Sequence, residues 1–204
     1  MAVQGNVVIL SKTLMSEGIC VGAWDVSNEK MLRLLDEKAQ KLSHNAPYEI
    51  GECYAITYSP HYRITPPHSE DAAVYECNYL DTLDEDDFND LISSLCDEDI
   101  QLDELFDGKL VWDGSGYMEP DDTTDYSVQI ATLDCSLTKN GNYYEHSRFG
   151  TSAKRIRYVG ARPLAELPYR LPAGTRIRFS LARFWDKDRD GKLRAYLQLS
   201  GIYE

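Results

Sequence analysis

Arginine, lysine and aromatic residues gather on strand-like segments near the end of the chain. Residues 154–158 read KRIRY and residues 176–181 read RIRFSL. Cations of this kind neutralise phosphates and rings stack on bases at about 1–3 kcal/mol per base, a combination typical of proteins that bind single-stranded nucleic acid. The candidate contacts are Lys154, Arg155, Arg157, Arg176, Arg178, Arg183, Trp185, Arg194 and Tyr196, with Tyr158 and Phe184 as further stacking residues. Alternatively, these arginines lie on a solvated sheet face or pair with acidic residues of the same chain.

Residues 175–203 predict two strands joined by a charged turn, because their apolar residues alternate with polar ones. The core face would carry Ile177, Phe179, Leu181, Leu197 and Leu199, and the opposite face Arg176, Arg178, Ser180, Arg194, Tyr196 and Gln198. Arg183 and Trp185 share the parity of the core residues. Either a bulge intervenes before them, or Trp185 belongs to the core.

The charged turn reads Asp186-Lys-Asp-Arg-Asp-Gly191, which matches the start of a calcium-binding loop. Its twelfth position is Leu197, where such a loop has a bidentate glutamate. No helical pattern flanks the segment. The sequence therefore favours a solvated hairpin turn over a calcium site.

Two histidines, His61 and His68, lie in a proline-rich segment close to Glu70 and Asp71. A metal site or an acid–base pair is one interpretation, and loop histidines bonded to backbone are the other, because no metal-binding spacing is present. Gly114-Ser-Gly116 lacks the full nucleophile elbow, and no glycine-rich phosphate loop occurs. We expect a protein without catalytic residues, metal or cofactor.

The net charge of −13 conceals a segregation of charge along the sequence. Residues 1–69 hold 6 bases and 7 acids, residues 70–125 hold 20 acids and Lys109 alone, and residues 139–204 hold 14 bases and 6 acids. A basic end suggests a polyanionic partner, whereas the acidic region suggests docking to a basic protein or mimicry of nucleic acid. The two regions would also neutralise each other within one molecule.

Five cysteines at irregular spacing, with no C-x-x-C pair, indicate reduced thiols in a cytoplasmic protein. The apolar run 7–10 is too short to cross a membrane, and no basic region precedes it as in a signal peptide. We expect no association with a membrane.

The elements that would position these residues are mainly β-strands. Strands are predicted at 6–10, 19–24, 52–58, 74–80, 128–133 and 154–159, and residues 31–35 fit a helix or a strand. The apolar residues Phe88, Leu91, Ile92 and Leu95 predict an amphipathic helix capped by Asp84, followed by a short helix over 100–106 that ends at Gly108. Residues 112–125 predict a loop, and Asn140-Gly141 a hairpin turn. We expect a mainly β fold with a helical insert, built as two small β-barrels.

Several short motifs resemble the dual OB domain (DuOB) family of prokaryotic conflict and defence systems. Residues 8–12 and 18–24 resemble the two opening strands of the family, and residues 31–35 resemble its arginine-bearing strand. Residues 51–54 resemble its Gly-acid-hydrophobic strand entry, and residues 68–71 resemble its His-x-Glu-Asp loop. The last two strands of the family resemble residues 181–185 and 197–203. A tryptophan usual in the arginine-bearing strand is absent here.

This resemblance implies two OB-like barrels, at 1–80 and 127–204, separated by an acidic helical insert or linker at 81–126. It implies no catalytic residues. It suggests a sensor or adaptor that binds single-stranded or structured nucleic acid within a larger antiviral defence assembly.

Overall fold

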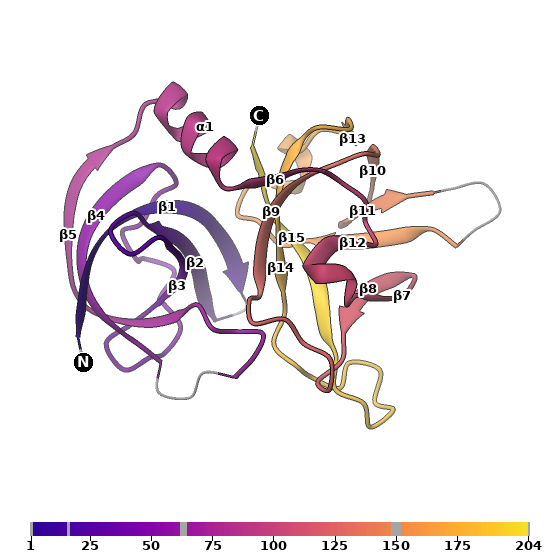
Figure 1. Cartoon of the computed structure of the whole chain (residues 1–204), viewed down its shortest axis with the longest axis horizontal. Coiled ribbons are helices and arrows are strands. Elements are labelled where there is room, and N and C mark those ends of the chain that lie inside the picture. The colour runs from indigo at the N-terminus through magenta and orange to yellow at the C-terminus, as the bar shows by residue number, and fades with distance from the viewer. Residues whose placement is uncertain (1, 16, 62–64, 148–151, 204) are drawn as a thin grey trace. The chain divides into compact units, whose positions relative to one another are not determined.

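The computed structural model describes residues 2–15, 17–61, 65–147 and 152–203. The chain divides into two compact units, Met1–Leu91 and Ile92–Glu204, and both are built mainly of β-strands (Figure 1). The expected mainly β class is therefore confirmed. No helix in the described ranges has the length and apolar character needed to cross a membrane.

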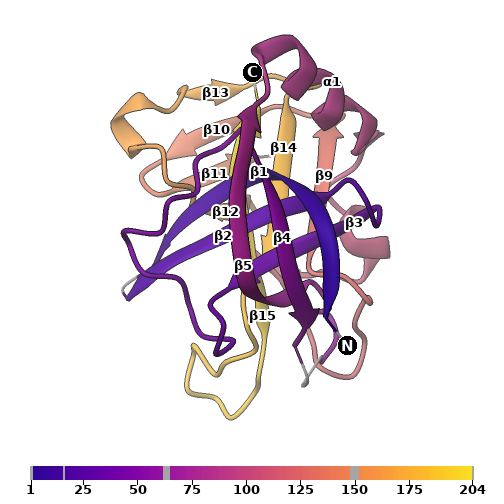
Figure 2. The same cartoon turned by 90° about the vertical axis from the view of Figure 1, so that its left-hand side faces the viewer.

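The first unit is a closed five-stranded barrel with the order β1-β2-β3-β5-β4, in which β4 pairs back to β1 (Figure 2). Its strands are β1 (Val3–Met15), β2 (Gly18–Asp25), β3 (Lys30–Leu35), β4 (Glu52–Pro60) and β5 (Asp71–Thr82). The pair β3–β5 is parallel and the others are antiparallel.

The ambiguous segment 31–35 forms the strand β3 because only a period of two fits its surroundings. Leu32 and Leu34 are buried in the barrel core, whereas Met31 and Arg33 point to the other side. Burial inside the barrel therefore decides between the two local conformations.

The predicted amphipathic helix is confirmed as α1 (Glu85–Ser94). The Asp84 carboxylate accepts a hydrogen bond of 2.9 Å from the backbone N–H of Asp87, which is the expected N-cap. Three further acidic residues occupy the first turn, where the helix dipole stabilises negative charge. Much of the acidic run therefore serves the helix.

The second unit is a ten-stranded sheet that curls around its own core without closing. Its order is β13-β10-β11-β12-β8-β15-β14-β9-β6, with β7 paired to β8 and β12 also paired to β15. The strands are β6 (Cys96–Ile100), β7 (Val111–Asp113), β8 (Ser115–Met118), β9 (Val128–Leu133), β10 (Leu137–Asn140), β11 (Tyr143–His146), β12 (Lys154–Tyr158), β13 (Arg170–Leu171), β14 (Arg176–Leu181) and β15 (Ala195–Tyr203). Strands β6, β7 and β8 come from the acidic segment 81–126.

Two local predictions in this acidic segment are wrong. In place of the short helix expected over 100–106, Ile100 ends strand β6, which pairs with β9, and helical structure begins only at the 3-10 helix Leu105–Gly108. The loop expected over 112–125 contains the hairpin β7–β8, which turns at Gly114 with φ +68°. Both segments contain a strand that pairs with a strand distant in sequence, β6 with β9 and β8 with β15, and this pairing overrides the local pattern.

The turn chemistry of the basic end is confirmed. Gly141, with φ +57°, connects β10 to β11 next to Asn140, in a conformation that favours glycine. The strands β14 and β15 form the expected terminal hairpin, with Leu181 opposite Leu197 and Phe179 opposite Leu199.

Candidate nucleic-acid interface

Four neighbouring strands of the second unit bring basic and aromatic side chains to one face. In the pairing register, Arg157 on β12 lies opposite Tyr143 on β11 and Gln198 on β15. Tyr196 lies opposite Tyr117 on β8. The alternate residues of these strands are buried, so these side chains point away from the core.

We call this surface the cationic aromatic face. It consists of Tyr117, Tyr143, Arg155, Arg157, Trp185, Lys187, Arg194, Tyr196 and Gln198.

Three rings of this face each have a cation lying against them. The guanidinium carbon of Arg155 is 5.6 Å from the ring centre of Tyr143, and that of Arg194 is 5.2 Å from Tyr117. The Lys187 ammonium is 4.4 Å from the ring centre of Tyr196. Contacts of this kind are worth about 0.5–1 kcal/mol each at exposed sites and so order the rings before any ligand arrives.

A small hollow of about 50 Å³ lies at the centre of the face. It is lined by the rings of Tyr143, Trp185 and Tyr196, together with Arg157 and Lys187. The Trp185 side chain is 50% exposed. Because such a volume holds only about two water molecules, a nucleic-acid base would lie across this hollow and against the rings, not inside it.

One cation of the face is already neutralised by the preceding turn. Arg194 binds Asp190 through two hydrogen bonds of 2.6 Å and 3.1 Å and lies 3.4 Å from Asp188. The hydrogen bond from Arg194 lowers the pKa of the Asp190 carboxyl to about 2. The pKa of Tyr196 is raised to about 12, mainly by burial and to a lesser extent by its hydrogen bond to Asp188. The Tyr196 hydroxyl therefore remains protonated at neutral pH.

Three cations of the face remain without a carboxylate partner. Arg155, Arg157 and Lys187 form no ion pair with any residue that the structure describes. Arg155 and Arg157 are exposed on the same side of β12, two residues apart. They are the groups best placed to meet phosphates.

Four predicted contacts do not join this face. Lys154 lies on the other side of β12, where it binds Asp103 and sits 4.9 Å from the ring centre of Trp112. Arg183 is exposed but does not line the hollow.

The remaining two, Arg176 and Arg178, lie at the far end of the terminal hairpin. A bulge shifts the register between Arg178 and Phe179, and Arg178 lies opposite Gly201. Its side chain is only 5% exposed and donates a hydrogen bond of 2.8 Å to the Ser200 hydroxyl, so its predicted place on an outward basic surface is wrong. Arg176 donates to the Ser93 hydroxyl at 2.7 Å.

Trp185 shares the parity of the core residues, but neither a bulge directly before it nor a place in the core accounts for its exposed position. Strand β14 ends at Leu181, and Trp185 forms only an isolated bridge to Arg194. Strand alternation therefore no longer fixes the direction of its side chain. Phe184 packs against the core instead, and Tyr158 is buried there, so neither predicted stacking residue is available.

The aspartates of the calcium-like turn bind groups of the turn and of β15. The Asp186 carboxylate accepts hydrogen bonds of 3.0 Å from the backbone N–H groups of Asp190 and Gly191. Asp188 and Asp190 bind Tyr196 and Arg194, and the twelfth residue, Leu197, is buried in the core. The three aspartates therefore stabilise the turn and hold the side chains of Arg194 and Tyr196 in place.

The histidine segment of the first unit is organised around an ion pair. Arg33 Nε lies 2.6 Å from Asp71 Oδ1, and Arg33 Nη2 lies 2.7 Å from Asp71 Oδ2. His68 and Glu70, which shortly precede Asp71 in the sequence, are buried, whereas His61 is half-buried. Across the described ranges, no three His, Cys, Asp or Glu side chains are grouped to hold a metal.

Sequence reasoning missed Tyr117, Tyr143 and Lys187 as members of the face, whereas it placed Gln198 correctly on the outward side of the terminal hairpin. Tyr143 follows from strand parity once its pairing with Arg157 is known, and Lys187 lies in the predicted turn. Tyr117 was assigned to a loop, so no pattern pointed to it.

One of the comparisons with known proteins agrees with this architecture. The model of the family described as Dual OB-containing domain, DuOB, matches residues 6–202. Neither the curated proteins nor the solved structures give a match.

Proposed function

Because the protein belongs to the dual OB-containing domain family, we propose that its second unit binds a single strand of nucleic acid on the cationic aromatic face. OB folds commonly bind oligonucleotides through a strand surface and its adjoining loops. In this role Arg155, Arg157 and Lys187 contact phosphates, while Tyr143, Trp185 and Tyr196 offer rings to the bases.

The observation that carries this proposal is that none of the three cations forms an ion pair with a described residue. The whole protein has a net charge of −13, yet Arg155, Arg157 and Lys187 have no carboxylate bound to them in the described parts of the sequence. Glu145 lies opposite Arg155 in the β11–β12 register and two aspartates flank Lys187 in the sequence, but none of them is within ion-pair distance of these cations. Cations left open beside ordered rings suit a phosphate backbone with stacked bases.

The interaction we propose is tolerant of sequence. Every base has a ring face that stacks, and the phosphates are common to all sequences. We further propose that the protein has no catalytic role and serves as the sensor or adaptor of a larger defence assembly, in which nucleic-acid binding is its input.

A fluorescence anisotropy titration tests the binding step. Fluorescein-labelled dT20 and U20 are titrated with the protein at low salt, and with the variant Arg157→Ala. We expect binding to at least one oligonucleotide and a clear loss of affinity in the variant. The matched control is Arg170→Ala, on strand β13 away from the face, which should bind normally. If neither oligonucleotide binds at low salt, the proposal is wrong.

A basic protein partner is the second candidate, favoured by the edge strand β6. This strand ends the sheet order and carries the exposed residues Asp97, Glu98 and Asp99. Acidic residues also protect an edge from unwanted pairing. A basic partner whose binding is lost in Glu98→Lys, with oligonucleotide binding unchanged, would support this second role.

A further inference from the structure

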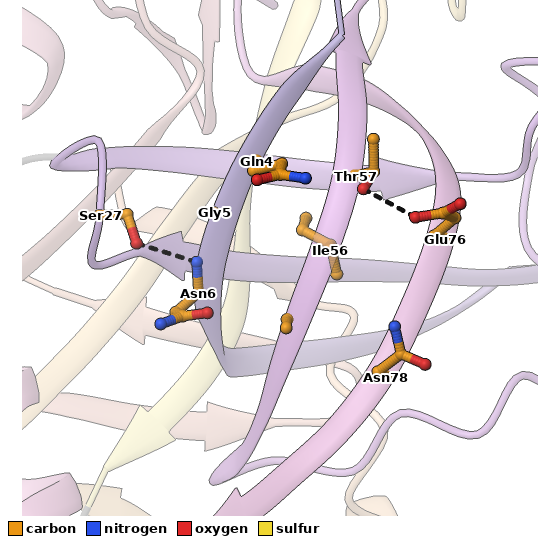
Figure 3. Close-up of a pocket in the computed structure, with 9 residues that line it drawn as sticks. Gln4, Gly5, Asn6, Ser27, Ile56, Thr57, Glu76 and Asn78 are labelled. Carbon is orange, nitrogen blue, oxygen red and sulfur yellow. Dashed lines mark hydrogen bonds between the residues drawn. The ribbon is translucent and has the colours of Figure 1, made fainter.

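A second hollow, of about 310 Å³, lies on the outer face of the first barrel. Figure 3 shows Gln4 and Asn6 on β1 at one side, and Glu76 and Asn78 on β5 at the other, with β4 between them. This hollow belongs to the first unit alone and has no role in the function proposed above.

The pairing register arranges these side chains in two parallel rows. Gln4, Thr57 and Glu76 form one row across the three strands. Asn6, Ala55 and Asn78 form the other. Because Ala55 has the smallest side chain among them, the centre of the second row is low and forms the floor of the hollow.

Most of the hydrogen-bonding capacity of the rows is unused. Thr57 donates to one oxygen of Glu76 at 3.1 Å, which leaves the other oxygen open. The side-chain amides of Gln4, Asn6 and Asn78 form no hydrogen bond with any described residue. Each amide offers a carbonyl acceptor and an N–H₂ donor, so the rows present both kinds of group on both sides.

The lining excludes two classes of ligand. Among the described residues, no lysine or arginine lines the hollow, and Glu76 would repel a phosphate. No aromatic ring of the described residues lines it either, so a base would lack a stacking surface. The remaining ligands are uncharged or cationic and rich in hydrogen-bonding groups.

The dimensions of the rows match an extended peptide. The rows lie two residues apart along the strands, a spacing of about 6.8 Å that equals the two-residue repeat of an extended peptide. The strands β1 and β5 are separated by two strand spacings, about 9.6 Å, which leaves room for one peptide above β4. Backbone carbonyl and N–H groups of that peptide would meet the amides on either side.

We propose that this hollow binds an extended segment of a partner protein, with a lysine or arginine side chain against Glu76. The carboxamides bind the backbone of the segment without regard to its sequence, and Glu76 supplies the preference for a basic residue. The acidic character of the protein favours such a partner over an acidic one.

Selection from a phage-displayed library of random seven-residue peptides tests the proposal on the full-length protein. Enriched peptides are synthesised with a fluorescent label and titrated against the wild type and two variants. Ala55→Trp fills the hollow from an outward position, and Glu76→Lys reverses its charge. The matched controls are Ile50→Trp and Glu37→Lys, at exposed positions that do not line the hollow.

We expect enriched peptides that share a lysine or arginine at one position. Their affinity should fall at least tenfold in Ala55→Trp, and Glu76→Lys should shift the preference to acidic residues, while both controls bind normally. Thermal unfolding verifies that each variant is folded. No enriched peptide family, equal binding to Ala55→Trp, or binding of adenosine or cytidine instead of peptides would overturn the inference. Oligonucleotide binding by the second unit is independent of either result.

Discussion

Arg33 on β3 and Asp71 on β5 form a two-point ion pair, with Nε 2.6 Å from Oδ1 and Nη2 2.7 Å from Oδ2. The two residues lie opposite each other in the parallel pair β3–β5, which helps to close the first barrel. Both belong to motifs that carry the family resemblance, residues 31–35 and 68–71. In this protein the two motifs therefore meet in a contact that joins neighbouring strands of the barrel.

Removing one partner of this pair should destabilise the first unit. Asp71 is buried, so Asp71→Asn leaves the Arg33 charge without its partner. Breaking a fully buried pair costs about 3–5 kcal/mol, and we expect about 2–4 kcal/mol because Arg33 is partly exposed. Urea denaturation measures the change. The double variant Arg33→Met/Asp71→Leu should recover much of it, and a double variant no better than Asp71→Asn would contradict the pairing.

A second buried carboxylate depends on a tyrosine. Asp25 is fully buried and accepts a hydrogen bond of 2.7 Å from the Tyr58 hydroxyl. Loss of a hydrogen bond to a charged group costs about 1.5–3 kcal/mol, so Tyr58→Phe should lower the free energy of unfolding by that amount. Tyr169→Phe is the control, because Tyr169 is the most exposed of the large hydrophobic residues in the described ranges. Equal stabilities for the two variants would refute the role of this bond.

The rings of the cationic aromatic face should matter for affinity. Trp185 is exposed and lines the central hollow beside Tyr143. Loss of one stacking ring costs about 1–3 kcal/mol, so Trp185→Ala should weaken oligonucleotide binding roughly 5- to 150-fold in an anisotropy titration. Leu193→Ala, another exposed residue of the same turn, should have little effect. Equal losses in both variants would point to a general disturbance of the turn.

The ion pair between Arg194 and Asp190 should be visible in a pH titration. The hydrogen bond from Arg194 lowers the pKa of Asp190 to about 2, from a reference value of 3.8. The stability that this pair contributes is therefore complete above about pH 4 and is lost as the pH falls towards 2. A carbon-13 NMR titration should place the Asp190 midpoint near pH 2 and move it up in Arg194→Gln. An unchanged midpoint in this variant would mean that Arg194 does not hold the carboxylate.

The sequence predicts the strands of the basic end but not the neighbours they acquire. The alternation of residues 154–158 identifies β12 and places Arg155 and Arg157 on one side of it. No local pattern, however, shows that Arg155 lies opposite Ser115, about forty residues earlier in the sequence. Tyr117 is found only through that pairing.

Three features of the structure are not visible in the local sequence pattern. Arg178 occupies an alternating strand, but a bulge directly after it, between Arg178 and Phe179, shifts the register so that Arg178 lies opposite Gly201. Trp185 follows the end of β14, where alternation no longer applies. The bond between Arg33 and Asp71 joins residues 38 positions apart, which no periodicity reveals.

The salt dependence of oligonucleotide binding tests the central claim most directly. If Arg155, Arg157 and Lys187 each neutralise one phosphate, the logarithm of the binding constant should fall with the logarithm of salt concentration at a slope of about −2 for single strands. The double variant Arg155→Ala/Arg157→Ala should reduce the slope to about −0.7. A slope near zero in the wild type, or an unchanged slope in the double variant, would contradict binding at this face.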